Sequence, residues 1–414
     1  MNFEWFFSRK TIWKDCRKNK ILRTIVVVTQ STIGFSVIIS ILTFSVGFGF
    51  KTVINQKLLN IQGQIVIVNN PKKEACFLSL EKKNLFFFNS ISFVYPFSEK
   101  DVIVCKNICE NKGIEDVERF VFKGISKDYN PVFFKNFLVS GSNKNLFSRP
   151  EILLSKKISI LLKLNKGSSI LIGFISMKNG KPFVFYKKFY ICGLYDTGIP
   201  EFDNVYLIGD MKHIQSMNGW KRDSVEGFEI FISSLDPKRI KSLKKEINQK
   251  YSDQFLVKTI YDQSHQEIIE WLNVFNVNIF VIIFSVMIAV IFNIIVFSII
   301  LLLERMKTIG ILKTLGARNK IIYKIFLYYI MHILTPPLII GNSIGFLFLI
   351  LQKKFRLISL NQTQYYVDVV PVYLNINHFL FINISIILVC LFSVFLPFLF
   401  IISKIPPIKV IKFE

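Results

Sequence analysis

Four long uncharged runs of mainly apolar residues divide the chain, and a long mixed segment separates the first run from the other three. The runs cover residues 24–50, 271–303, 325–352 and 369–403. Each exceeds the ~20 apolar residues that a helix needs to cross a ~30 Å hydrocarbon core. The pattern predicts an α-helical membrane protein with four transmembrane helices in a 1+3 layout.

The mixed segment, residues 51–270, is long enough to form its own hydrophobic core. Short alternating runs predict β-strands at 63–69, 183–194 and 227–233, and longer runs predict helices at 155–164 and 237–251. Asn179-Gly180 is a hairpin signal between two β-like runs, and Asp236 stands where it would cap the second helix. The segment is therefore expected to be a large α+β extracytoplasmic domain between helices 1 and 2.

These runs give a complete division of the chain. It comprises a cytoplasmic or interfacial N-terminal segment (1–23), helix 1 (24–50), the inserted domain (51–270), helix 2 (271–303), a short basic segment (304–324), helix 3 (325–352), an outer loop (353–376), helix 4 (377–403) and a tail (404–414). Residues 51–62 and 262–273 look helical and would extend helices 1 and 2 as stalks. Helices 1 and 2 are then expected to be the only covalent links to the inserted domain.

Positive charge sets the expected orientation. The N-terminal segment, the basic segment and the tail are rich in Lys and Arg, whereas the outer loop has few. Because positively charged short flanks stay in the cytoplasm, both termini are expected there and the inserted domain outside. The net charge of +24 could also indicate nucleic-acid binding. That class is disfavoured, because the aromatic residues sit mainly in apolar runs and no nucleic-acid motif is present.

Catalytic motifs are missing from the sequence. There is no GxxxxGK[ST] phosphate loop, no nucleophile elbow and no HExxH, and the His residues are isolated. Asp196, Glu201 and Asp203 cluster in GLYDTGIPEFDN, which fits acid–base chemistry less well than a polar turn after a strand. Cys105 and Cys109 lie four apart and are either unlinked thiols or a disulfide in an exported domain. We therefore expect no catalytic residue, metal or cofactor in this chain.

Several polar and small residues interrupt the predicted spans. Pro336-Pro337 should kink helix 3, and Gly341 with Gly345 permits close helix approach, either within the chain or between subunits. Asn278 and Asn293 are polar residues in helix 2 that should face protein rather than lipid. The spans hold no Asp, Glu, Lys or Arg, which argues against an ion-coupled carrier.

The basic segment between helices 2 and 3 reads ERMKTIGILKTLGARNKIIYK. Apolar residues alternate with basic ones, and Gly316-Ala317 resembles a helix stop. A short helix of this kind can dock into a groove on a cytoplasmic partner. An ordinary tight connection that obeys the positive-inside rule is the alternative.

At these residues the chain resembles a known group of permeases. ERMKTIGILKTLGA and the C-terminal PPIKVIKFE resemble the coupling segment and the ending of permeases in the FtsX/MacB superfamily of type VII ABC transporters. FEWFFSRK and SVGFGFKTVINQKLLNIQGQIVI are similar to the lipoprotein-releasing permeases LolC and LolE. EILLSKKISILLKLNKGSSILI and YICGLYDTGIPEFDNVYL resemble the MacB-like outer domain of those proteins.

The resemblance implies a non-catalytic subunit in the bacterial inner membrane with a periplasmic domain. The implied partners are an ABC ATPase subunit that binds the ATP, a second permease in a homo- or heterodimer, membrane lipid, a lipoprotein substrate and a periplasmic carrier. ATP-driven movement would pass through the permease as a mechanical stroke that extracts the lipoprotein for transfer to the carrier.

The resemblance also implies site residues. Coupling to the ATPase would use Glu304, Arg305, Lys307, Ile309, Gly310, Ile311, Leu312, Leu315 and Gly316. A carrier-binding hairpin would include Asn179, Gly180, Lys181 and Pro182, with a plain β-hairpin as the alternative. An acyl-chain cavity would be lined by Phe44, Phe48, Trp271 and Phe275, unless these rings face lipid or pack between helices.

Three other functions fit the same layout. A MacB-like efflux permease is one, although such proteins commonly fuse the ATPase to the permease. An FtsX-like signal transmitter is another, although its outer domain is usually much smaller than residues 51–270. A membrane-anchored scaffold without an ATPase is the third, and it predicts that the Gly310–Gly316 segment tolerates substitution.

Overall fold

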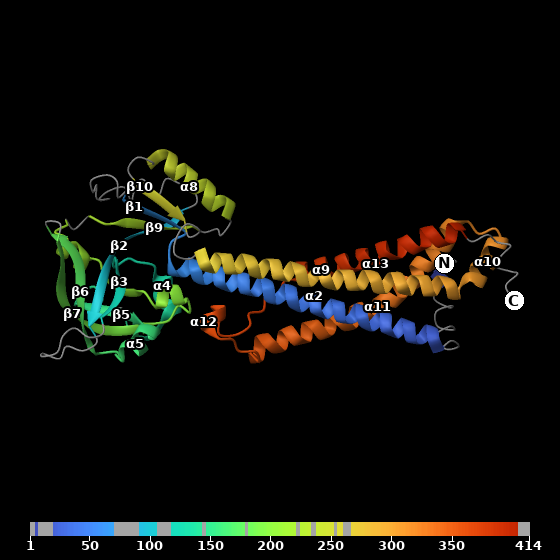
Figure 1. Ribbon diagram of the computed structural model, residues 1–414, viewed down its shortest axis with the longest axis horizontal. Coiled ribbons are helices and arrows are strands. Elements are labelled where there is room, and N and C mark those ends of the chain that lie inside the picture. The colour runs from blue at the N-terminus through green and yellow to red at the C-terminus, as the bar shows by residue number, and fades with distance from the viewer. Residues whose placement is uncertain are drawn as a thin grey trace. The chain divides into compact units, whose positions relative to one another are not determined.

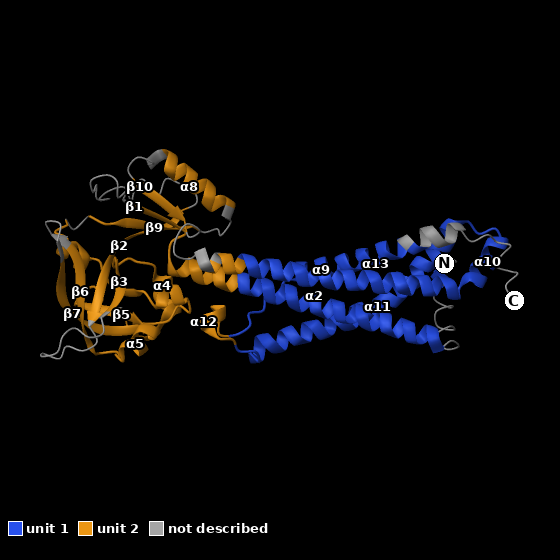
Figure 2. Ribbon diagram, in the orientation of Figure 1, with its two compact units in different colours: residues 1–51, 273–359, 369–414 blue, residues 52–272, 360–368 orange. Residues whose placement is uncertain are grey.

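The structure is a computed structural model that forms two compact units (Figure 2). It describes residues 5–6, 20–69, 91–105, 117–142, 146–178, 181–220, 224–232, 237–251, 255–259 and 266–404. Unit 1 comprises residues 1–51, 273–359 and 369–414, and unit 2 comprises residues 52–272 and 360–368. Most of the predicted N-terminal interfacial segment, Asp236 and Cys109 lie outside the described residues.

Unit 1 is built from long apolar helices (Figure 1). They are α2 (Lys20–Ile61), α9 (Gln266–Glu304), α11 (Asn319–Phe355) and α13 (Ile376–Lys404), with the short α10 (Met306–Thr314) between α9 and α11. Among the described residues, four helical segments are long and apolar enough to cross a membrane: Lys20–Ile61, Glu270–Glu304, Asn319–Phe355 and Ile376–Phe395. Their facing sides pack into one core that includes Val37, Ile41, Ile294, Leu301, Ile330 and Ile386.

Small residues bring α2 and α11 close together. A Cβ added to Gly341 would lie 2.9 Å from the Gly34 carbonyl oxygen and 3.0 Å from Val37 Cβ, and one added to Gly345 would lie 3.4 Å from Ile41. The Gly341–Gly345 pair, for which the sequence left two uses open, therefore serves packing inside the chain.

One of the two prolines of α11 is accommodated by a side-chain hydrogen bond from α2. A proline has no N–H, so Pro336 and Pro337 leave the carbonyls four residues earlier without their helical donors. The Thr335 hydroxyl donates to the Met331 carbonyl at 2.8 Å and lies 3.3 Å from the His332 carbonyl oxygen. The side-chain amide of Gln30 donates to the Ile333 carbonyl at 3.3 Å. A polar residue of α2 thus replaces the bond that Pro337 cannot make.

The two asparagines of α9 have different surroundings. Asn293 donates from its side-chain amide to the Thr32 hydroxyl of α2 at 3.4 Å, as expected for a polar residue in a span. Asn278 is exposed, so the expectation that it faces protein is wrong for the packing within unit 1. It lies on a side of α9 that carries exposed Val274, Val277 and Val281.

Unit 2 contains one ten-stranded sheet. The strands are β1 (Ile65–Asn69), β2 (Ile91–Cys105), β3 (Val117–Ile125), β4 (Leu138–Gly141), β5 (Glu151–Ser155), β6 (Ser169–Lys178), β7 (Lys181–Tyr195), β8 (Tyr206–Asp210), β9 (Gly227–Ile232) and β10 (Phe255–Thr259). Their order is β10-β1-β9-β2-β3-β8-β5-β7-β4, and β6 pairs with β2 and β7. The pairs β3–β8 and β5–β7 are parallel and the others are antiparallel.

The sheet has two hydrophobic cores, and β2 contributes to both. Val94 belongs to the core under α8 (Pro237–Tyr251), whereas Val102 belongs to the core under α5 (Lys156–Leu162) and α7 (Lys212–Met217). Short helices α4 (Pro131–Phe137), α6 (Pro200–Asp203) and α12 (Gln362–Tyr365) complete the unit. The strands and helices expected in the inserted domain are all present, and the α+β expectation for this domain is confirmed.

Candidate functional site

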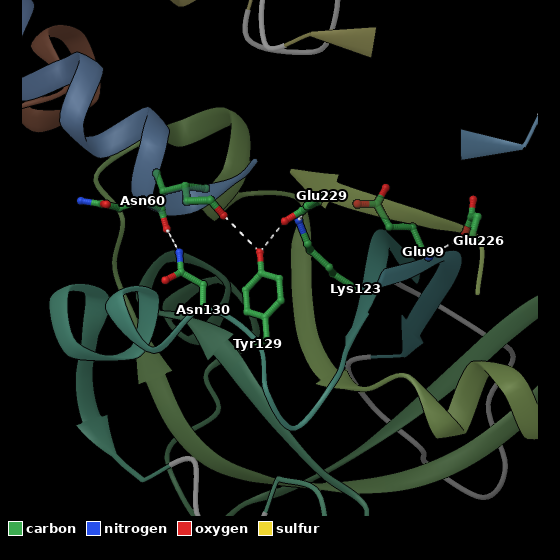
Figure 3. Close-up of polar contacts among 8 residues, drawn as sticks. Asn60, Glu99, Lys123, Tyr129, Asn130, Glu226 and Glu229 are labelled. Carbon is green, nitrogen blue, oxygen red and sulfur yellow. Dashed lines mark hydrogen bonds and ion pairs between the residues drawn. The ribbon is translucent and has the colours of Figure 1, made fainter. Parts of the chain in front are cut away.

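The end of α2 is held by the residues that follow β3 (Figure 3). Asn130 donates from its side-chain amide to the Asn60 carbonyl at 3.3 Å, and its side-chain oxygen accepts from Val132 N at 3.0 Å and so caps α4. The Tyr129 hydroxyl lies 3.5 Å from the Ile61 carbonyl oxygen. The last turn of α2 is therefore held by the side-chain hydrogen bond of Asn130, and Tyr129 lies next to it.

A buried ion pair stands behind this attachment. Lys123 of β3 and Glu229 of β9 pair at 2.5 Å with side-chain exposures of 2% and 0%, and the Tyr129 hydroxyl donates to the second oxygen of Glu229 at 2.7 Å. The Lys123 ammonium also lies 5.6 to 5.8 Å from the ring centroids of Phe97, Phe202 and Tyr206. Buried charges are tolerated only when they are paired and hydrogen-bonded, and Lys123 and Glu229 meet both conditions.

Two more carboxyl groups lie beside the ion pair (Figure 3). Glu226 accepts from the backbone N–H of Glu99 at 2.6 Å. Burial, with added repulsion from Glu229 and Glu226 and a partial offset by Lys123, raises the pKa of Glu99 to about 7. The protonation of this cluster therefore changes near neutral pH.

The cluster Asp196, Glu201 and Asp203 folds as a polar turn after β7. The Asp203 carboxylate accepts from the Thr197 hydroxyl at 2.7 Å and from the backbone N–H groups of Thr197 and Gly198 at 3.1 and 3.0 Å. Its oxygens are occupied by the turn, so the structural interpretation of this cluster is confirmed and the acid–base interpretation is not supported.

Within unit 1, α10 presents two apolar side chains outward. Ile309 is 1% exposed and packs into the helical core, whereas Ile311 and Leu315 are 56% and 79% exposed. Gly316 has a φ of 83°, a left-handed conformation that ends the helix, as the Gly316-Ala317 pattern predicted. The nine predicted coupling residues therefore differ in burial. Ile309 and Gly310 are buried, whereas Ile311 and Leu315 are exposed apolar residues.

Strands β6 and β7 form the predicted hairpin, with Lys178 opposite Lys181. Asn179 and Gly180 lie outside the described residues, as do the side chains of Lys181 and Pro182. Sequence reasoning missed the next four residues of β7, because Phe183, Val184, Phe185 and Tyr186 look like a strand core and yet are all exposed.

A cavity of about 350 Å³ lies beside the half of this hairpin that is nearer its turn. Phe183, Phe185 and Phe174 form an apolar wall, and Lys100 and Lys187 add positive charge. An exposed aromatic surface of this kind is typical of a protein-binding site.

The four aromatic residues assigned to an acyl-chain cavity pack in separate contacts. Phe44 and Phe48 stack at 5.8 Å in unit 1, and Phe275 contacts Phe50 at 5.0 Å. Trp271 belongs to unit 2 and contacts Tyr366 at 5.7 Å.

Unit 1 has a different apolar groove, with a volume of about 450 Å³, between α2 and α11. Residues of both helices line it, namely Val27, Gln30, Ser31, Gly34, Phe35, Ile38, Pro336, Pro337, Ile340, Gly341, Ile344 and Phe348. Gly34 and Gly341 form part of its wall, so the same small residues that allow close helix packing also shape the groove.

Comparison with known proteins places part of the chain in a family. Residues 280–406 match the FtsX-like permease C-terminal domain. An uncharacterized membrane protein of Buchnera aphidicola subsp. Schizaphis graminum (strain Sg) is 23% identical over 451 residues, and the match covers 100% of both chains.

Two solved structures are similar at low identity. The periplasmic region of MacB from Actinobacillus actinomycetemcomitans is 16% identical, with 52% of this chain and 98% of that chain covered and a TM-score of 0.32. A domain of a putative permease from Porphyromonas gingivalis is 10% identical, with 49% and 93% covered and a TM-score of 0.26.

The matched residues contain α10, α11, α13 and the part of α9 from residue 280 onwards, and they include the exposed Ile311–Leu315 pair and part of the apolar core of unit 1. This part of the chain is therefore similar to the C-terminal domain of FtsX-like permeases.

Proposed function

We propose that the chain is the non-catalytic permease subunit of a type VII ABC transporter that releases lipoproteins from the inner membrane to a periplasmic carrier. The observation that carries the proposal is α10, a short basic helix between two membrane-spanning helices that buries Ile309 and exposes Ile311 and Leu315. An exposed apolar pair one helical turn apart is suited to a groove on another protein. The partner is an ATPase subunit on the cytoplasmic side, which binds and hydrolyses the ATP.

Lipoprotein release needs an energy source. Each acyl CH₂ contributes ~0.8 kcal/mol to membrane anchoring, so a protein with three acyl chains does not leave the bilayer spontaneously. The groove between α2 and α11 offers an apolar wall of acyl-chain dimensions. In the proposed cycle one acyl chain occupies this groove, and Phe44, Phe48, Trp271 and Phe275 keep their packing roles.

The stroke reaches unit 2 through α2. This helix crosses the unit boundary without a break, and its last carbonyls meet Asn130 and Tyr129, which are backed by the Lys123–Glu229 ion pair. Because Asn130 holds the last turn of α2 and the ion pair joins β3 to β9, a displacement of α2 would be passed to the sheet.

The released lipoprotein is handed over at the β6–β7 hairpin. Its exposed aromatic residues and the adjacent cavity supply a surface for an apolar, acidic region of the carrier. A second permease, identical or paralogous, completes the membrane unit by packing on the exposed side of α9, where Asn278 would gain a polar partner.

Purification of the tagged full-length chain in mild detergent, with mass spectrometry of what accompanies it, tests the assembly. A stoichiometric ATPase together with acylated proteins is expected. An ATPase without acylated proteins would support efflux or signalling instead, and a folded chain with no ATPase would favour the scaffold and contradict the proposal.

A further inference from the structure

The loop between α11 and α13 enters unit 2. The chain leaves unit 1 after Ser359, residues 360–368 belong to unit 2, and unit 1 resumes at Val369. The expectation that helices 1 and 2 are the only covalent links to the inserted domain concerned residues 51–270 and stays a prediction, whereas the loop adds a further segment of the chain to unit 2. Unit 2 is joined to α11 and α13 as well.

The neck of this loop is rigid. Ser359 and Val369 form an antiparallel bridge, and the Leu360 N–H donates to the Asp368 carbonyl at 2.8 Å. The Gln352 side chain, near the end of α11, accepts from the Ile358 N–H at 3.1 Å and donates to carbonyls on both strands of the neck. A displacement of α11 is therefore passed into the loop.

Tyr366 is the residue at which the loop meets the rest of unit 2. The Lys57 ammonium, on the last turns of α2, donates to the Tyr366 carbonyl at 2.9 Å. The Tyr366 hydroxyl donates to Glu201 Oε1 at 3.2 Å, and its ring contacts Trp271 of α9 at 5.7 Å. One side chain thus touches the start of α9 and the turn after β7, while its backbone binds α2.

The backbone at this point is held in an uncommon conformation. Tyr366 has a φ of 60°, and a non-glycine residue keeps this left-handed conformation only when surrounding contacts hold it there. Opposite it, a Cβ added to Gly198, which has a φ of 70°, would lie 2.5 Å from the Gln362 side-chain nitrogen and 2.6 Å from the Lys57 ammonium. A side chain at position 198 would be strained by this φ and would require the ends of Gln362 and Lys57 to move.

We infer that Tyr366 is a positioning residue that latches the α11–α13 loop onto unit 2 and gives the ATPase-driven stroke a second path. This path runs from α10 along α11 to the Gln352 neck and ends at Lys57 and Glu201, beside the junction of α2. The inference rests on the proposed function, because the path matters only if α10 receives the stroke.

Hydrogen–deuterium exchange of the full-length chain in nanodiscs tests the latch itself. Tyr366→Phe removes the donor and Glu201→Leu removes the acceptor of the hydroxyl–carboxylate bond, and exchange across residues 360–368 should rise about 3- to 10-fold in each variant. Tyr365→Phe is the matched control, because Tyr365 is 39% exposed in the same loop, and exchange should stay at the wild-type rate. Unchanged exchange in both test variants would overturn the latch.

The role of Tyr366 in coupling is tested with the chain and its copurified ATPase. The measured quantity is the amount of lipoprotein released per ATP hydrolysed. Tyr366→Phe and Lys57→Met should lower this ratio several-fold at an unchanged ATPase rate and melting temperature, and Lys57→Arg, which keeps a donor, should restore it. If exchange across residues 360–368 rises in the variants but the lipoprotein released per ATP hydrolysed stays at the wild-type value, the inference is overturned. If the wild type itself releases nothing with ATP, the proposed function fails and the positioning role fails with it, while the exchange data still decide whether the loop is latched.

Discussion

Lys123 and Glu229 form a buried ion pair at 2.5 Å, and Tyr129 connects the same carboxylate to the last carbonyl of α2. The pair joins β3 to β9, which lie on either side of β2 in the sheet. It therefore stabilises the junction of the two hydrophobic cores at the point where the membrane helix arrives.

Lys123→Met should destabilise unit 2 by about 3 to 5 kcal/mol, because Glu229 is left charged and buried without its partner. Chemical denaturation of the full-length chain in detergent, followed by the near-ultraviolet signal of unit 2, measures the loss. Arg119→Met is the control: Arg119 and Asp101 pair at 3.0 Å with exposures of 72% and 49%, and such pairs contribute at most about 1 kcal/mol. Equal losses in the two variants would contradict the role of the buried pair.

The stability of unit 2 should fall as the pH rises toward neutral. The pKa of Glu99 is raised by burial from its ordinary value of 4.5 to about 7 in the folded chain, where it faces Lys123, Glu229, Glu226 and Lys258. Between these values the folded state binds more protons than the unfolded state, so the free energy of unfolding decreases with pH through this window.

Glu99→Gln should flatten that part of the profile. Melting temperatures recorded from pH 4 to 8 give the measurement, and Glu246→Gln, at an exposed position of α8, should leave the slope unchanged. A wild-type melting temperature that rises between pH 4.5 and 7, with a slope that Glu99→Gln removes, would contradict the prediction.

The double variant Ile311→Ala/Leu315→Ala should weaken ATPase binding by roughly 10-fold or more, because both side chains are exposed anchors on α10. Its melting temperature should stay at the wild-type value. Thr314→Ala, at an exposed position of the same helix, is the control for binding. Ile309→Ala should behave differently and lose about 2 to 5 kcal/mol of stability, because this residue is buried in the helical core.

The double variant Phe183→Ser/Phe185→Ser should reduce transfer to the carrier about 10-fold while leaving the ATPase rate and the fold intact, because both rings are exposed. Transfer is measured as lipoprotein bound to soluble carrier after ATP addition. Tyr190→Ser provides the comparison, since Tyr190 is exposed on the same strand nearer the base of the hairpin. If the double variant transfers lipoprotein to the carrier at the wild-type level, the hairpin has no role in the transfer.

The helices and strands of this protein could be predicted from the sequence better than the contacts between them. Long uncharged runs and period-two runs depend only on local pattern, so α2, α9, α11, β1 and β9 were all predictable. The burial of Ile309 beside the exposure of Ile311 and Leu315 depends on which side of α10 faces the core, and a nine-residue helix with apolar residues on several sides does not reveal this.

Contacts between segments far apart in the chain could not be predicted from the sequence. Lys123 and Glu229 are 106 residues apart, and neither stands in a motif, so nothing local marks them as a pair. Tyr366 lies in a loop that reads as an ordinary connection, and its left-handed backbone is held by Lys57 and Glu201. The exposed aromatics of β7 look like core residues because a strand that projects beyond its covering helices keeps the same pattern.

ATP-dependent release of an acylated lipoprotein from proteoliposomes tests the central claim most directly. The full-length chain and its copurified ATPase are reconstituted with the lipoprotein, and a soluble carrier is added outside. The account predicts that lipoprotein appears in the soluble fraction only with hydrolysable ATP and that Ile311→Ala/Leu315→Ala reduces it several-fold. Sustained ATP hydrolysis with all lipoprotein remaining in the membrane would contradict the account.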